Sequence, residues 1–157
     1  MSATLPACLA GFRIHLVGAK GTGVCALAEL LVGAGAEVTG SDVDDTFYTD
    51  EVLAAIGVPV SPFSADNVRG GVDLVIHSKA YTAASNPELA EAEALGVPTM
   101  SYPEALGSLS ASRDSSGICG VHGKTTTTAL AGVMARAARL PTAVLVGSAV
   151  GAFGGRS

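Results

Sequence analysis

The chain has 157 residues, of which 48% are hydrophobic and 15% charged, so it can bury a core and is not an intrinsically disordered protein. Its net charge of -5 at pH 7 excludes a strong general attraction to nucleic acid or to an anionic membrane. No apolar run reaches the ~20 residues of a membrane-spanning helix, and the opening segment MSATLPACLAGFRI lacks the basic start of a signal peptide. Cys8, Cys25 and Cys119 have no metal-binding spacing, so we expect reduced thiols in a cytoplasmic protein.

Short apolar runs alternate with helical stripes over the first two thirds of the chain. Residues 13–18 and 37–42 are typical of strands, and residues 22–34 between them have apolar side chains at helical spacing. The Asn86-Pro87 pair is typical of a helix start, and Gly96 of its end. The other expected elements are a helix at 49–56, strands at 58–63, 73–78 and 98–102, and a helix at 103–109.

This order of elements predicts an α/β fold with a parallel sheet, because each helix acts as a crossover that returns the next strand parallel to the last. Ligands of such sheets bind at the carboxyl ends of the strands. Polar side chains gather at three expected strand ends: Ser41 and Asp42, His77 and Ser78, and Ser101 and Tyr102. Strand ends are often polar, so these residues indicate a site only together with another signal.

Residues 110–117 are small and polar, which predicts a linker. After it the pattern begins again with a strand, a helix and a strand, at 117–120, about 124–139 and 142–146. That is the first β-α-β of a second α/β domain. The helix is expected to bury one stripe, formed by Leu130, Val133, Met134 and Ala137.

The sequence G-V-H-G-K-T, at 120–125, stands between this strand and this helix. Such a turn lets backbone N–H groups surround phosphate oxygens, and the helix N-terminus favours their negative charge. Lys124 would then reach the terminal phosphates, and the Thr125 hydroxyl would bind Mg²⁺. The longer P-loop pattern is incomplete, because Ile118 stands where it has glycine. His122 fits either a phosphate contact or a plain loop residue.

A second glycine-rich turn, G-A-K-G-T-G at 18–23, joins the first expected strand to the first expected helix. It suits a diphosphate at the helix N-terminus, where Lys20 would add a positive charge or would simply be solvated. From Gly21 the turn also fits the G-x-G-x-x-A fingerprint, and Asp42 lies about 20 residues further on, so an NAD(P)-binding oxidoreductase domain stays open.

Two phosphate sites separated by a linker need one explanation. A dehydrogenase accounts only for the first site, and a simple P-loop NTPase accounts only for the second. An enzyme that takes a nucleotide-linked substrate at one site and ATP at the other accounts for both.

With both turns in place, the chain from Arg13 onward resembles the Mur ligase family of peptidoglycan synthesis. The resemblance rests on HLVGAKGTGVCALAELL (15–31), GAEVTGSD (35–42), LVIHSKAYTAASNPELAEAEALGVP (74–98), GVHGKTTTTAL (120–130) and VGSAVGAFGGRS (146–157). Two glycine turns with GSD between them are more specific than either turn alone. Lys20 and Val121 depart from the family, which usually has glycine and threonine there.

The resemblance implies that residues 1–110 form a Rossmann-like domain for UDP-N-acetylmuramic acid and that residues 111–157 begin the central MgATP-binding domain. It implies an ATP-dependent ligase that joins an amino acid, expected to be L-alanine, to the muramic acid carboxylate through an acyl phosphate. The implied UDP-sugar residues are Gly18, Lys20, Gly21, Thr22, Gly23, Ser41, Asp42, His77 and Ser78. The implied ATP-binding residues are Gly120, Val121, His122, Gly123, Lys124, Thr125 and Thr126. Of these, Lys124 and Thr125 are the implied catalytic residues, and Thr125 is the implied Mg²⁺ ligand.

Two further alternatives stay open. A related ligase adds a recycled tripeptide to the same UDP-sugar, and a stand-alone UDP-sugar-binding module would need no chemistry at all. Because members of the family are much longer, we expect this chain to be an incomplete fragment that is inactive alone. The adenine pocket and the remaining Mg²⁺ ligands would then lie outside it, and no oligomeric state follows from the sequence.

Overall fold

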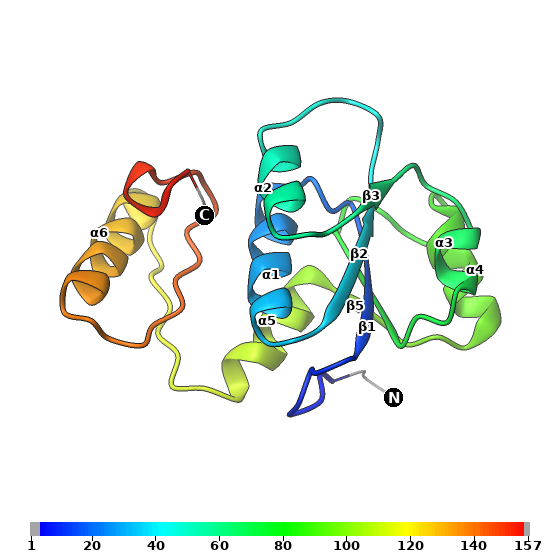
Figure 1. Ribbon diagram of the computed structural model, residues 1–157, viewed down its shortest axis with the longest axis horizontal. Coiled ribbons are helices and arrows are strands. Elements are labelled where there is room, and N and C mark those ends of the chain that lie inside the picture. The colour runs from blue at the N-terminus through cyan, green and yellow to red at the C-terminus, as the bar shows by residue number, and fades with distance from the viewer. Residues whose placement is uncertain (1–3, 156–157) are drawn as a thin grey trace.

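A computed structural model describes residues 4–155 of the chain. Its centre is a five-stranded sheet in which every neighbouring pair of strands is parallel, in the order β3-β2-β1-β4-β5 (Figure 1). The predicted α/β fold with a parallel sheet is therefore confirmed. The strands are β1 (Arg13–Val17), β2 (Glu37–Ser41), β3 (Val60–Ser61), β4 (Leu74–His77) and β5 (Thr99–Ser101).

Helices cover both faces of this sheet (Figure 1). One face carries α1 (Thr22–Gly33), α2 (Thr49–Ala55) and α5 (Tyr102–Ala111), and the other carries α3 (Asp66–Arg69) and α4 (Pro87–Leu95). From β1 the chain adds β2 and β3 on one side, and then adds β4 and β5 on the other side, so the strand order switches between the neighbours β1 and β4. Such a switch point opens a crevice at the carboxyl ends of the two strands, and open α/β sheets bind ligands there.

The two faces of the sheet have different cores. Beneath α1 the core is large and apolar, and fully buried side chains of β1 and α1 meet in it: Ile14, Leu16, Leu27 and Leu31. The face beneath α3 and α4 has a smaller apolar cluster that includes Val17 and Leu89. Successive side chains of a strand point to opposite faces, so His15 lies on this second face together with Val17.

The helices of this lobe begin close to the predicted residues. The Asn86 side chain accepts hydrogen bonds from the backbone N–H groups of Glu88 and Leu89 at the start of α4. The Glu104 carboxylate accepts one from the backbone N–H of Ser101 at the start of α5. The one-turn helix α3 has no counterpart in the prediction, because a single turn has no periodicity to read. No helix in residues 4–155 is long and apolar enough to cross a membrane.

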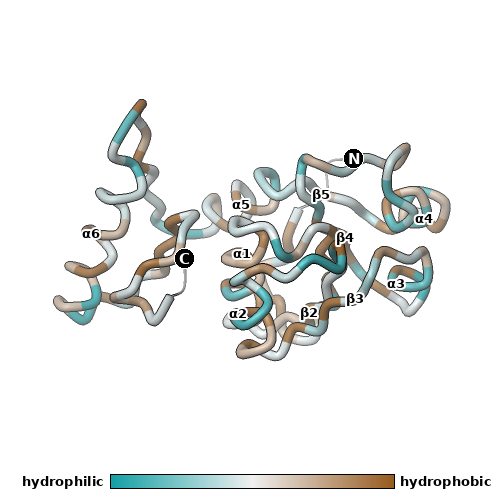
Figure 2. Tube along the Cα trace, turned by 90° about the horizontal axis from the view of Figure 1, so that it is seen from above, coloured by the Kyte–Doolittle hydropathy of each residue, from teal (hydrophilic) through white to brown (hydrophobic). Residues whose placement is uncertain are grey.

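Residues 112–155 form a second lobe beside α1 and α2 (Figures 1 and 2). It holds α6 (Lys124–Ala137), which was predicted, and the short 3-10 helix η1 (Gly151–Phe153). The strands predicted at 117–120 and 142–146 are wrong, since neither segment is a strand in this lobe. A strand needs a hydrogen-bonded neighbour, and the two segments do not pair with each other or with the sheet.

The side of α6 that packs is also not the predicted one. All four side chains of the predicted stripe are exposed: Leu130 (59%), Val133 (38%), Met134 (70%) and Ala137. The packed side carries Gly132 instead, where an added Cβ would come within 2.7 Å of the Phe153 ring and 3.0 Å of Val144. The segment that contains Val144 and Phe153 packs on α6 at Gly132, where the absence of a side chain allows close approach. The packed side of α6 is therefore the side with this glycine, and it is not the side with the largest apolar side chains.

We expect α6 to exchange its backbone amide protons faster than β1 and β4. The two strands are central in the sheet and are covered on both faces, whereas Gly132 is the one fully buried residue of α6. Hydrogen exchange followed residue by residue measures this difference. Equal protection of α6 and β1 would contradict the packing described above.

Candidate functional site

The glycine-rich turn after β1 is held against the end of β2. The backbone N–H groups of Gly18 and Ala19 both donate to the Ser41 carbonyl, at 2.9 and 3.1 Å. Gly18 has a φ of 81°, a left-handed value that glycine adopts without strain. A Cβ at this position would also come within 2.8 Å of the Tyr81 ring. The backbone conformation and the close approach of Tyr81 therefore both require glycine here.

α1 begins with its first backbone N–H groups open. Gly21 is the N-cap residue, no side chain caps the helix, and its first turn has no acidic residue. The first N–H groups of a helix have no partner within the helix, and the helix dipole gives them a positive potential. The Thr22 hydroxyl stands at the same place. This arrangement suits a phosphate or diphosphate group.

All three tyrosines of the chain lie around this turn. Tyr81 packs on it as described, and the Tyr102 ring lies over Gly23, where an added Cβ would come within 3.0 Å of the ring. The Tyr48 hydroxyl donates to Thr22 Oγ1 at 3.0 Å. The turn is therefore walled by aromatic side chains that come from α5 and from the loops around the crevice.

Asp42 connects the end of β2 to the glycine turn. Its Oδ2 accepts the backbone N–H of Lys20 at 2.7 Å, and its Oδ1 accepts the backbone N–H of Val43 at 2.8 Å. Burial, followed by the charge of the Asp42 carboxylate, raises the pKa of the Tyr81 phenol. The Asp42 carboxylate therefore binds backbone groups of the neighbouring loops. In a dinucleotide-binding domain, the acidic residue at this position hydrogen-bonds to a ribose of the cofactor instead.

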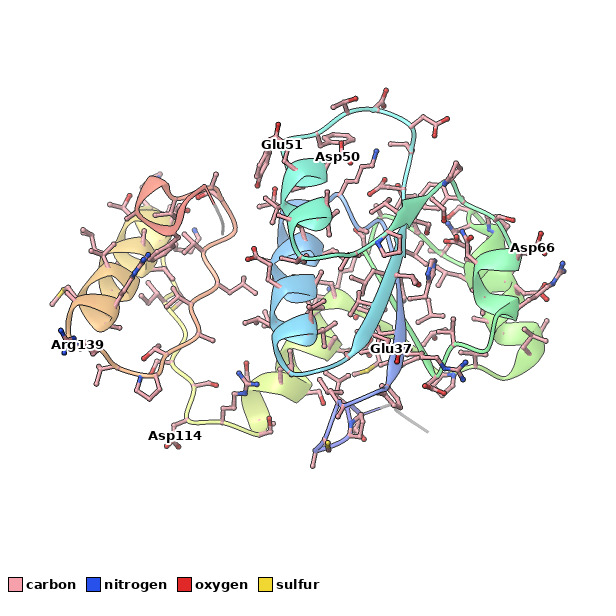
Figure 3. All side chains as sticks on the ribbon, in the orientation of Figure 1. Glu37, Asp50, Glu51, Asp66, Asp114 and Arg139 are labelled. Carbon is pink, nitrogen blue, oxygen red and sulfur yellow. The ribbon has the colours of Figure 1, made fainter. Side chains whose placement is uncertain are left out.

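The Lys20 ammonium is bound to the loop between β2 and α2. It donates to the carbonyl oxygens of Val43 and Asp45, at 2.9 and 2.7 Å, and lies 3.3 Å from an Asp50 carboxylate oxygen. Asp50 is at the start of α2, next to this loop (Figure 3). Lys20 thus ties that loop to the glycine turn, and its charge is already paired before a ligand arrives.

Ser41 is fully buried, and its hydroxyl donates to Glu88 Oε2 at 2.5 Å, away from the crevice. Glu88, in the first turn of α4, was missed in the sequence. It is 0% exposed, accepts a hydrogen bond from Asn67 Nδ2 at 2.6 Å, and lies 3.4 Å from His15 Nε2. Burial raises the pKa of the Glu88 carboxyl, but hydrogen bonds from His15, Ser41 and Asn67 outweigh it and hold this pKa below its ordinary value.

The strands contained a signal for this buried network. His15 interrupts an apolar strand. Its Nδ1 is hydrogen-bonded at 2.8 Å to the hydroxyl of Thr39, its register partner on β2. Thr39 and Ser41 alternate along β2, so they share the face on which His15 lies. Three polar side chains on one buried face require a polar partner. Glu88 itself gave no signal, because Asn-Pro-Glu reads as an ordinary helix start.

His77 ends β4, and Ser78 follows it and lies next to the glycine turn. The Ser78 backbone N–H donates to the Val17 carbonyl at 3.0 Å, and its Cβ lies 3.1 Å from the place of a Cβ on Gly18. His77 is half-buried, and its Nδ1 lies 3.0 Å from the Ser78 carbonyl oxygen. The fold thus brings these two residues together with the first glycine turn, as the sequence predicted.

The second glycine turn bends sharply before α6. Gly123 is the N-cap of α6 with a φ of 76°, and the helix has no side-chain cap and no acidic residue in its first turn. Lys124 folds back, and its ammonium donates to the carbonyls of Gly120 at 2.7 Å and Val121 at 3.4 Å. This bent turn with its surface lysine has the form that a phosphate loop needs. The other residues predicted for this site are exposed: His122, Thr125 and Thr126.

A cavity of about 440 Å³ lies between α1 and the second lobe. Its lining includes Leu30 of α1 and Arg136, Arg139 and Phe153 of the second lobe, and no residue of either glycine turn. The cavity is therefore separate from both candidate phosphate sites.

A sequence profile described as "Mur ligase family, catalytic domain" matches residues 13–114. The chain belongs to the Mur ligase family. This membership favours the ligase over the NAD(P)-binding oxidoreductase that the Gly21 fingerprint left open. The structure agrees, because both carboxylate oxygens of Asp42 already hold backbone N–H groups of this Mur ligase chain.

Proteins named UDP-N-acetylmuramate–L-alanine ligase are similar to this Mur ligase chain in sequence. The one from Treponema pallidum (strain Nichols) is 58% identical over 148 residues, which cover 94% of this chain and 31% of that protein. The one from Desulfitobacterium hafniense is 43% identical over 92% of this chain and 32% of its own length. The chain therefore spans about a third of the length of these relatives.

Solved structures of Mur ligases share the fold. UDP-N-acetylmuramate-alanine ligase from Thermotoga maritima has a TM-score of 0.69 and 32% identity, over 81% of this chain and 30% of that one. UDP-N-acetylmuramate:L-alanyl-gamma-D-glutamyl-meso-diaminopimelate ligase from Neisseria meningitides has a TM-score of 0.73 and 28% identity, over 82% of this chain and 40% of that one.

We expect Glu88→Gln to destabilise the chain at pH 7, by about 2 to 4 kcal/mol, and to destabilise it less at pH 3. Folding lowers the pKa of Glu88, so its charge stabilises the folded state fully above the ordinary value of 4.5, and this contribution is lost as the pH falls through the lower folded value. Urea unfolding at both pH values measures the effect. Glu93→Gln, exposed on the same helix, is the control. An equal loss at pH 3 and pH 7 would show that the charge of Glu88 is not involved.

Proposed function

We propose that this chain is the UDP-sugar-binding lobe and the beginning of the ATP-binding lobe of a cytoplasmic UDP-N-acetylmuramate–L-alanine ligase. The observation that carries the proposal is the pair of uncapped helix starts at glycine turns, α1 and α6, in two separate lobes. Each suits a phosphate group, and the proposed reaction uses two nucleotides. Similarity to the Treponema pallidum ligase over 94% of the chain supports the same assignment.

In the UDP-sugar site, the diphosphate would lie on the backbone N–H groups of Thr22 and Gly23, with the Thr22 hydroxyl beside it. Gly21 would shape the turn, because its backbone N–H donates to the Gly18 carbonyl at 3.2 Å. The rest of the ligand would extend across the crevice toward His77 and Ser78. Gly18, Lys20, Ser41 and Asp42 would act behind the diphosphate, because their hydrogen bonds shape the turn and the loop next to it.

In the second lobe, the residues present fit MgATP by their chemistry. The turn from Gly120 to Gly123, which includes Val121 and His122, would surround the phosphates with backbone N–H groups. Lys124 would leave its two carbonyl partners for the terminal phosphates, and the exposed Thr125 hydroxyl would bind Mg²⁺. Thr126 adds a further N–H group at the start of α6. Bound Mg²⁺ supplies neutralisation of the phosphate charge.

The proposed reaction has two steps. The muramic acid carboxylate attacks the γ-phosphorus of ATP, which gives an acyl phosphate and ADP. The amino group of L-alanine then attacks the acyl carbon, and inorganic phosphate leaves with the electron pair of the broken C–O bond as the amide forms. Positioning and charge stabilisation supply most of the catalysis of phosphoryl transfer, so Lys124 and Thr125 would be the catalytic residues of this chain.

One comparison supports a tripeptide, in place of L-alanine, as the amine that is joined to the UDP-sugar. The Neisseria meningitides structure, whose name specifies a tripeptide, has the higher TM-score of the two structures, 0.73 against 0.69. We place L-alanine first because sequence identity favours it, at 32% against 28% for the two structures and 58% for the Treponema pallidum protein. Both alternatives keep the same UDP-sugar.

We expect the 157-residue chain to bind UDP and not NADH, as measured by calorimetry. Thr22→Glu should weaken UDP binding by about tenfold or more, because it places a negative charge beside the diphosphate. The same charge favours the N-terminus of α1, so the variant should remain folded. Thr99→Glu, at an exposed position of the edge strand β5, is the matched control and should bind UDP like the wild type. Tight NADH binding without UDP binding would restore the oxidoreductase interpretation.

We also expect no turnover of ATP by the purified 157-residue chain in the presence of UDP-N-acetylmuramic acid and L-alanine. The chain spans about a third of the length of the ligases it resembles, and most of the proposed ATP lobe is not in it. A coupled assay for released phosphate measures the rate. Turnover that requires both the UDP-sugar and L-alanine would refute this expectation, and it would show that the residues present suffice for the reaction.

A further inference from the structure

The face of the sheet beneath α3 and α4 holds a buried polar network where an apolar core would be expected. Glu88 and Ser41 are 0% exposed and His15 is 1% exposed. An ionised carboxylate is costly to bury, and replacing such a group by apolar side chains of similar volume is often neutral or stabilising. A contribution to stability therefore does not explain why the network is polar. Its contacts with the neighbouring strands and loops indicate another role.

The Glu88 carboxylate contacts β1, β2, helix α3 and the loop before α3. Its Oε2 accepts the Ser41 hydroxyl at 2.5 Å. Its Oε1 accepts Asn67 Nδ2 at 2.6 Å and the backbone N–H of Ser64 at 3.2 Å, and lies 3.4 Å from His15 Nε2. The carboxylate is thus fully hydrogen-bonded, and it fixes the Ser41 side chain from the side of the sheet opposite to α1.

Ser41 carries this constraint to the glycine turn. Its side chain is held by Glu88, and its carbonyl oxygen accepts the backbone N–H groups of Gly18 and Ala19, at 2.9 and 3.1 Å. The next residue, Asp42, accepts the backbone N–H of Lys20 at 2.7 Å. Three consecutive N–H groups of the turn are therefore held by two consecutive residues at the end of β2, and the side chain of the first is held by Glu88.

We propose that Glu88 is a positioning residue for the first phosphate site, and that it acts through the Ser41 hydroxyl to fix the glycine turn that leads into α1. The inference rests on the proposed binding of the UDP-sugar at this turn. Glu88 touches no ligand. It links the start of α4, on one face of the sheet, to the start of α1, on the other face.

The test uses the 157-residue chain with UDP as the probe. Wild type, Ser41→Ala, Glu88→Gln and the double variant are titrated with UDP by calorimetry at a temperature where each is folded. Leu89→Ala is the matched control, because it removes a buried side chain next to Glu88 on α4 and leaves the network intact. The amide NMR signals of Gly18, Ala19 and Lys20 are recorded for each variant without ligand.

We expect Ser41→Ala and Glu88→Gln each to weaken UDP binding by about tenfold, and the double variant to be no weaker than the single ones, because one hydrogen bond joins the two residues. The three amide signals should shift in the same direction in all three variants. Leu89→Ala should keep its affinity for UDP within about twofold of the wild type while its unfolding midpoint falls. Ser41→Ala keeps the charge of Glu88, so it decides the question if Glu88→Gln does not fold.

Two results would overturn the inference alone: wild-type affinity in Ser41→Ala with unshifted turn signals, or an equal loss of affinity in Leu89→Ala. The second would mean that any loosening of α4 weakens the site. If the wild-type chain itself does not bind UDP, the proposed function fails, and the inference fails with it.

Discussion

The close approach of the glycine turn to β2 is the constraint on which the crevice depends. Gly40 makes it possible, because an added Cβ there would lie 2.6 Å from the Cβ of Ala19. With no side chain between them, the turn lies directly on the strand, and the Ser41 carbonyl can accept two consecutive N–H groups. That contact sets the direction in which α1 leaves the sheet, and with it the direction of its open N–H groups.

The two faces of the sheet contribute different properties to this arrangement. The face beneath α1 is apolar, and its burial of side chains such as Leu16 and Leu27 stabilises the fold without directional preference. The opposite face holds Glu88 and His15, whose hydrogen bonds have fixed lengths and directions. Because β1 and β2 belong to both faces, the turn that follows β1 is supported by a nonspecific core on one side and by directional bonds on the other.

The sequence predicted most of the first lobe because its signals are local. Short apolar runs indicated the strands, and the Asn86-Pro87 pair indicated the start of α4, since a cap acts within a few residues of itself. Both glycine turns were found for the same reason. The partners of side chains were harder to predict: Lys20 has a position in the turn that suits a phosphate, yet its ammonium is bound by the loop between β2 and α2. Glu88 and the packed side of α6 were missed, because both depend on segments distant in the chain.

The lysine of the second turn has a consequence for ligand selection. The Lys124 ammonium already donates to the carbonyls of Gly120 and Val121. An anion must therefore compete with these two carbonyl groups for the ammonium. Only the difference between the new contacts and the old ones contributes to affinity. A lone phosphate ion offers few oxygens in that competition, whereas a polyphosphate chain with its metal ion offers several at once. In the proposed ATP site, Lys124 would thus compete with the ligand for the loop and favour polyphosphates over a single phosphate ion.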